Sequence, residues 1–293
     1  MEIYQANSIG KIAFENLSKN SSGEVSGITS RGIFLKMDDN SIVFISNMDF
    51  HNPLTINLDS ELTNPSAIVK EKVFISGTEI YFIESSLVIH HASAKVWSSQ
   101  NNTRKITNLP SLNAVRSFLL TLHSALTQPN PYLEAVLDLL DTSIPQDNSN
   151  EILSFLRGLL EGINHSPEHC LPSFRYLVGR GRGLTPSGDD ILLGWIYALT
   201  RLAGHTTLQI SPLHNLLAAT LENNTTSISI NLIKAAMLGE IDERLLRAFE
   251  CMVFDQSPTP AILTSILEWG SSSGVEVCAG MGLGIMSLSQ YRR

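Results

Sequence analysis

The residues best suited to chemistry are concentrated in positions 179–190, which read GRGRGLTPSGDD. This stretch combines alternating glycines, two arginines, two hydroxyl side chains and two carboxylates, and an apolar segment follows at 191–199. Thr185-Pro186 predicts a helix start, because proline at the first helical position loses no intrahelical hydrogen bond. The first N–H groups of a helix lack partners within it, and the helix dipole is positive there. The stretch therefore predicts an anion site at the start of a buried helix.

Side-chain chemistry divides the residues of this stretch into two groups. Arginine forks match phosphate and carboxylate oxygens, and small residues let a ligand approach the backbone. We therefore predict substrate binding by Arg180, Arg182, Gly183, Thr185, Ser187 and Gly188. We predict catalytic roles for the two carboxylates, Asp189 and Asp190. They stand where a nucleotide P-loop carries Lys and Ser/Thr, so this stretch is not a nucleotide P-loop. The alternatives are a glycine turn that serves packing and an acidic pair that only complements the helix dipole.

A degenerate second copy of the motif lies near the C-terminus. Residues 187–194 read SGDDILLG, and residues 273–280, about 86 positions later, read SGVEVCAG. Both are Ser-Gly-x-acid followed by apolar residues and a glycine that favours close helix contact. We predict that the two starts face one pocket, with Ser272 and Ser273 in substrate binding and Glu276 in catalysis. The alternative is a chance match between two helix starts.

A third polar helix start lies between the two copies. Residues 223–232 read NNTTSISINL, a run of amide and hydroxyl side chains that leads into an apolar segment. Thr226 or Ser227 is expected to cap the helix. Because there are more hydroxyls than one cap requires, we also predict that Thr226 contributes to substrate binding in the same pocket.

Composition excludes several classes of protein. The chain has 293 residues, a net charge of −8, 43% hydrophobic residues and no long Lys/Arg run, which argues against nucleic acid as a partner. The three cysteines lack zinc or disulfide spacing, so we expect reduced cysteines and no metal site built on them. We see no secretion signal, and no apolar run reaches the ~20 residues that a membrane-spanning helix needs. We expect a soluble cytoplasmic protein without a membrane partner.

Hydrophobic periodicity predicts an α+β protein with two domains. Residues 1–97 are expected to form a β-rich barrel or sandwich, 98–110 a linker, and 111–293 an all-α domain that carries the Gly-rich site. Strands are predicted at 11–14, 32–35, 41–45, 54–58, 73–75, 80–83 and 87–89. Helices are predicted at 112–126, 131–140, 151–163, 189–202, 212–222, 227–238, 242–254, 260–269 and 275–289.

The motif LTPSGDD after a Gly-rich approach, the TSIS segment at 226–229 and the later SSGVE resemble a known family. They look like the AllH-type subunit of bacterial oxamate carbamoyltransferase, and the resemblance extends over most of the chain. It implies one component of a hetero-oligomer that transfers a carbamoyl group between carbamoyl phosphate and oxamate in anaerobic allantoin degradation, a branch of purine catabolism. This chain departs from the family pattern at Ser271 and Glu276, where relatives carry His and Asp.

Carbamoyl transfer requires a clamp for a phosphate dianion, donors to the carbamoyl oxygen and a group that orients the attacking nitrogen. The arginines of the loop suit the first task, and Thr185, Ser187 and the helix-start N–H groups suit the second. Either aspartate, with Glu276 opposite, suits the third or would hold Mg²⁺ as a cofactor. The rival interpretation is a non-catalytic subunit that binds a small carboxylate or phosphate or is structural. A hydrolase lacks support, since no GxSxG or HExxH motif is present.

Overall fold

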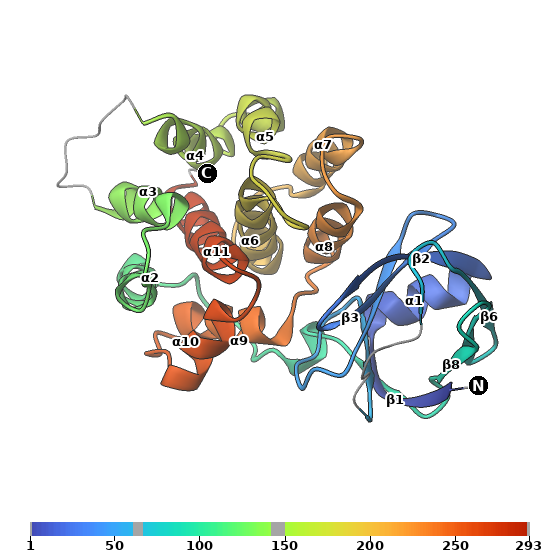
Figure 1. Cartoon of the computed structure of the whole chain (residues 1–293). Coiled ribbons are helices and arrows are strands. Elements are labelled where there is room, and N and C mark those ends of the chain that lie inside the picture. Colours follow the sequence, from blue (N-terminus) through green and yellow to red (C-terminus); the bar gives the residue numbers. More distant parts are fainter. Residues whose placement is uncertain (1, 61–66, 142–149, 292–293) are drawn as a thin grey trace. The chain divides into compact units, whose positions relative to one another are not determined.

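The computed structural model describes residues 2–60, 67–141 and 150–291 of the chain. Contacts divide the chain into two compact units, residues 1–102 and 103–293 (Figure 1). The first unit is built mainly from strands and the second from helices, so the predicted α+β class is confirmed.

The first unit is a closed barrel. Its strands are β1 (Glu2–Gly10), β2 (Ser22–Thr29), β3 (Gly32–Met37), β4 (Ile42–Ser46), β5 (Thr55–Leu58), β6 (Lys72–Ser76), β7 (Glu79–Phe82), β8 (Leu87–His90) and β9 (Lys95–Trp97). The order β5-β4-β3-β2-β6-β7-β8-β1 closes because β1 also pairs with β5. The last strand, β9, pairs with the second half of β1, beyond the part that pairs with β8. Aliphatic side chains that point inward, such as Val25, Ile33 and Leu35, are fully buried and form the barrel core.

The predicted strand at 11–14 is wrong, because this segment begins the helix α1 (Lys11–Lys19). Its buried residues are Ala13, Asn16 and Leu17, which follow helical and not alternating spacing. The strands β1, β2 and β9 were not predicted. In β2 the sequence SGEVSGIT contains too few apolar residues to show a period of two, and the strand is defined by its pairing with β3 and β6.

All nine predicted helices are present in the second unit. They are α2 (Leu112–Ser124), α3 (Pro131–Leu140), α4 (Glu151–Gly162), α6 (Ser187–Leu202), α7 (Ser211–Leu221), α8 (Ser227–Met237), α9 (Glu243–Val253), α10 (Pro260–Leu267) and α11 (Ser273–Gln290). The short helix α5 (Leu171–Leu177) was missed, since seven residues give too little periodicity to detect. Among the described residues, none of the helices has the length and apolar character needed to cross a membrane.

The helices α6 and α11 form the centre of this unit and approach each other backbone to backbone. A Cβ added at Gly194 would lie 2.8 Å from the Met281 nitrogen, and one added at Gly280 would lie 3.0 Å from the Trp195 nitrogen. Each added atom would be closer still to a carbonyl oxygen of the facing helix. The contacts are reciprocal between equivalent positions of the two sequence copies, as expected if the copies are related by a local pseudo-two-fold axis.

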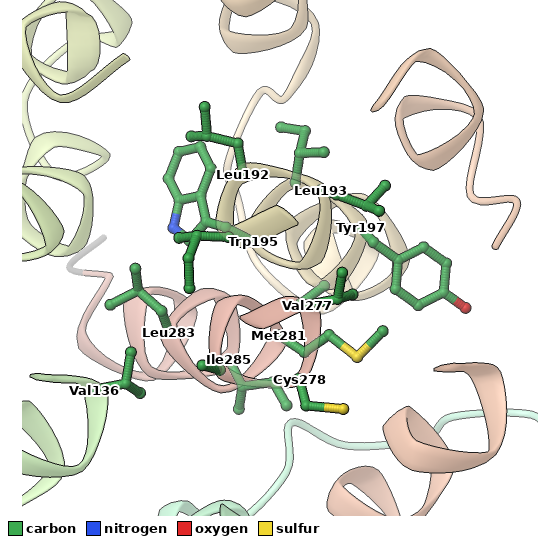
Figure 2. Packing of buried hydrophobic residues seen from close by; sticks show 14 of the residues in the cluster. Val136, Leu192, Leu193, Trp195, Tyr197, Val277, Cys278, Met281, Leu283 and Ile285 are labelled. Carbon is green, nitrogen blue, oxygen red and sulfur yellow. The ribbon is translucent and has the colours of Figure 1, made fainter. Parts of the chain in front are cut away.

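Large side chains surround this close contact on both helices. Trp195 and Tyr197 of α6 and Met281 of α11 are fully buried (Figure 2). The Trp195 indole donates a hydrogen bond of 3.2 Å to Ser287 Oγ on α11. The glycines therefore set the separation of the helices, and the surrounding side chains fix their register.

We predict that Gly280→Ala destabilises the protein by about 1–3 kcal/mol, because the added methyl group must separate two packed backbones. The better helix propensity of alanine offsets about 1 kcal/mol of the steric cost, so the measured loss is the net of the two effects. Chemical unfolding of the full chain measures it.

Gly204→Ala is the matched control, because a Cβ at Gly204 has nothing within 4 Å. That variant should change the free energy of unfolding by less than about 0.5 kcal/mol. Equal effects of the two substitutions would contradict the proposed role of the α6–α11 contact.

Candidate functional site

The starts of α6 and α11 lie side by side, as the repeated motif predicts. Thr185 Oγ1 and Ser273 Oγ are 3.0 Å apart and form a hydrogen bond. From these adjacent starts the two helices run in the same direction, since successive contacts advance along both chains together. The positive ends of two helix dipoles therefore meet at one place in the helical unit.

The backbone donors at these starts are largely used within the protein. The Gly188 N–H donates to the Arg180 carbonyl oxygen at 2.9 Å, and the equivalent Gly274 N–H donates to the Trp269 carbonyl oxygen at 2.9 Å. In α6 the next two N–H groups donate to the carbonyl oxygen of Pro186, the residue before the helix. In α11 the next two donate in the same way to the carbonyl oxygen of Ser272. The glycine loop thus caps its own helix, and any ligand contact at these starts must rely more on side chains.

Asp190 is the most unusual side chain at this site. Only 1% of it is exposed, and its Oδ2 atom has no hydrogen-bond partner among the described residues. Burial raises the pKa of Asp190 well above its ordinary value. The Ser273 hydroxyl lowers this pKa, whereas the negative charge of Glu276 raises it further. The surroundings of Asp190 therefore favour its protonated form, and its Oδ2 atom is left without a hydrogen-bond partner in the described part of the chain.

Glu276 occupies the position in α11 that Asp190 occupies in α6, and it is 3% exposed. Its Oε1 accepts a hydrogen bond of 3.3 Å from Asn130 Nδ2, and its Oε2 accepts one of 3.2 Å from Ser272 Oγ. Asn130 also caps α3, accepting from the Leu133 N–H at 3.0 Å. Asn130 was not predicted as a site residue, although an asparagine directly before a proline is a typical helix cap.

Asp189 connects two loops. Its Oδ1 accepts a hydrogen bond of 2.8 Å from the Gly179 N–H, and its Oδ2 accepts one from the Thr225 hydroxyl. Burial raises the pKa of Asp189 despite these hydrogen bonds, which lower it. Because these two hydrogen bonds join the loops that contain Gly179 and Thr225, the geometry favours a structural task for Asp189.

Thr226 also holds the glycine loop in place. Its hydroxyl caps α8 by accepting from the Ser229 N–H at 3.1 Å, which confirms the expected cap. The same hydroxyl donates to the Leu184 carbonyl oxygen at 2.6 Å. The start of α8 is thereby fastened to the loop before α6, and the three predicted helix starts lie close together.

The two arginines of the loop differ in their surroundings. Arg180 lies over the Tyr176 ring, 3.8 Å from its centre, and donates to Glu151 Oε2 at 3.2 Å. Arg182 and Gly183 are exposed, and Arg182 makes no hydrogen bond or ion pair with the part of the chain that is described. Ser187 is partly buried at the first position of α6.

Tyr132, in the first turn of α3, is a further site residue that the sequence analysis missed. It is 6% exposed, and burial raises its pKa to about 12, with smaller contributions from Tyr176 and from the Glu276 and Asp189 charges. Arg180 acts in the opposite direction and lowers the pKa. The Tyr132 hydroxyl is thus within electrostatic reach of both the arginine side and the acidic side of the site.

Across residues 2–60, 67–141 and 150–291, no group of three or more His, Cys, Asp or Glu side chains is arranged to hold a metal ion. The three cysteines are buried and unpaired with one another. The candidate site is therefore described by its carboxyl, hydroxyl, amide and guanidinium groups.

Comparison with known proteins points to the same segment. Residues 177–285 match the family described as oxamate carbamoyltransferase subunit AllH, which confirms the resemblance for this part of the helical unit. The matched residues include the glycine loop, both helix starts and α8. No solved structure matches the chain significantly.

We predict that Asp190→Asn stabilises the protein at neutral pH. Between the unfolded pKa of aspartate, about 3.9, and the raised pKa of Asp190, the folded chain holds a proton that the unfolded chain has lost. The free energy of unfolding of the wild type therefore falls as pH rises through this window, by up to about 1.4 kcal/mol per pH unit. Asparagine, which stays neutral, removes that loss.

Denaturant unfolding at several pH values from about 4 to 8 measures the effect. Asp138→Asn, at an exposed position of α3, serves as the control and should follow the wild type. A difference between Asp190→Asn and wild type that stays constant with pH would contradict the burial of an acidic proton at this site.

Proposed function

We propose that this chain is a carbamoyltransferase subunit whose substrate site lies where α6 and α11 begin. One observation carries the proposal: the buried Asp190 carboxyl has an acceptor oxygen without a partner, next to the equivalent Glu276, within the matched segment. An unsatisfied buried acceptor is unfavourable, and a ligand with N–H donors would satisfy it. The amide groups of oxamate and carbamoyl phosphate both provide such donors.

In the proposed reaction the amide nitrogen of oxamate attacks the carbamoyl carbon of carbamoyl phosphate. The new C–N bond forms, the C–O bond to phosphate breaks, and the nitrogen loses one proton. Asp190 in its ionised form accepts an N–H hydrogen bond and then the proton, since its raised pKa makes it a better base than an exposed aspartate. Glu276, held by Asn130 and Ser272, orients the same amide group.

The phosphate is proposed to bind on the side of the glycine loop. Of the two arginines we propose Arg180, because it is held over the Tyr176 ring and its charge lowers the pKa of the buried Tyr132. The substrate must compete with Glu151 for that guanidinium, which is half exposed and therefore accessible. The hydroxyls of Thr185 and Ser273, which contact each other where the two helices begin, are proposed to donate to the carbamoyl oxygen.

The family description supports a role as one subunit of a hetero-oligomeric enzyme. We propose further that this enzyme acts in the cytoplasm during allantoin breakdown. A non-catalytic, small-anion-binding role is the second candidate. This role is favoured because the glycine loop already makes hydrogen bonds within the protein. They involve Asp189, Thr226 and the Gly188 N–H.

We predict that Arg180→Ala weakens the binding of carbamoyl phosphate and phosphate roughly ten- to a hundredfold, the usual effect of losing a charge-assisted contact. Arg182→Ala, at the more exposed position, should have the smaller effect. Glu151→Gln should strengthen binding by a few fold at most, because exposed ion pairs contribute only about 0–1 kcal/mol. Calorimetric titration of the full chain measures each affinity, and melting curves verify folding. Wild-type affinities in both arginine variants would exclude the anion clamp.

We also predict that Asp190→Asn and Glu276→Gln each reduce carbamoyl transfer to oxamate by about 10²- to 10⁴-fold, as expected when a general base or its orienting partner is lost. The assay uses the chain assembled with the other subunits of the enzyme. Asp138→Asn is the matched control and should retain full transfer. If both acidic-site variants remain within tenfold of wild type while still binding phosphate, the chain is better described as the non-catalytic subunit.

A further inference from the structure

A groove between α5 and α7 is separate from the acidic site. It encloses about 530 Å³, which lies within the usual range of ~300–1,000 Å³ for small-molecule pockets. The residues that line it are Leu171, Arg175, Val178, Leu216, Ala219, Thr220 and Asn224. None of them was predicted as a site residue, and none belongs to the carboxyl pair.

The groove carries one charge, that of the exposed Arg175. Thr220 Oγ1 donates to the Leu216 carbonyl oxygen, and Asn224 Nδ2 donates to the carbonyl oxygens of Thr220 and Glu222. Arg175 is the only ionisable lining residue, and it makes no hydrogen bond or ion pair with the described part of the chain. An unpaired guanidinium beside aliphatic walls suits a ligand with an anionic head and an apolar body.

The groove is directly connected to the loops that hold Asp189. Its wall residue Val178 precedes Gly179, and its wall residue Asn224 precedes Thr225. The Gly179 N–H and the Thr225 hydroxyl are the two donors to Asp189 described above. The backbones also touch, because a Cβ at Gly179 would overlap the Asn224 carbonyl oxygen.

We propose that the α5–α7 groove binds a small organic anion with an apolar body and that this ligand strengthens the attachment of the glycine loop. The anionic head binds Arg175, and the apolar body contacts Leu171 and Leu216. A ligand that bridges α5 and α7 restrains the ends of both helices, and these ends lead into the two donors to Asp189. Binding here is thereby coupled to the order of the loop before α6. The proposal does not rest on the carbamoyl-transfer role.

Binding is tested on the full chain with hexanoate, acetate and hexanamide as probes, without any substrate. Hexanoate should bind more than tenfold tighter than acetate, since each buried CH₂ contributes up to about fourfold, and tighter than the neutral hexanamide. Arg175→Gln should weaken hexanoate binding by about tenfold or more. Ala219→Phe, which fills the groove from an exposed position, should abolish it.

Lys105→Gln is the matched control, because it removes the same charge at another exposed position of the helical unit. Coupling is measured by hydrogen exchange of the Gly179 amide, which should slow at saturating hexanoate in wild type and stay unchanged in Ala219→Phe. Hexanoate binding that equals acetate binding, or that is unaffected by both groove variants, overturns the proposal. So does unchanged Gly179 exchange in the saturated wild type. Because no substrate is present, these outcomes are independent of the carbamoyl-transfer test.

Discussion

The close approach of α6 and α11 is the constraint on which the helical unit depends. Gly194 and Gly280 let each backbone contact the other, and a side chain at either position would separate the helices. Because the two contacts are equivalent under the internal repeat, they also fix which residues meet at the helix starts. Asp190 and Glu276 face the same site because each stands four residues before its glycine.

This arrangement explains why acidic residues with so little exposure persist in the interior. Residues inside a packed helix pair are normally apolar, since an unpaired buried charge is strongly destabilising. Here the neighbouring groups are hydroxyls and an amide, and the pKa of Asp190 is shifted toward the neutral acid. A natural protein retains such an arrangement most readily where it serves a site, because an apolar pair would pack there at lower cost.

The sequence allowed the α+β class, nine helices and the meeting of two helix starts to be predicted, because these depend on local periodicity and on a repeated motif. Other features depend on tertiary contacts. Lys11–Phe14 looks like a strand by composition, but its helical form follows from the burial of Ala13 and Leu17 against the barrel. Asn130 and Tyr132 lie far from the motif in sequence and reach the site only because α3 packs beside α11. Likewise, the linear motif does not indicate that residues of two separate loops donate hydrogen bonds to Asp189.

The protonation of the acidic pair links the helix geometry to ligand binding. Two parallel helices that begin side by side place two positive dipole ends together, and an ionised carboxylate in each first turn would compensate them. Burial opposes ionisation more strongly, so the pKa of Asp190 rises well above its usual value. A ligand with N–H donors changes this balance, because hydrogen bonds to a carboxylate favour its charged form. Such a ligand would favour the ionised form of Asp190, which both helix starts also favour, so ligand binding and the two helix dipoles act in the same direction.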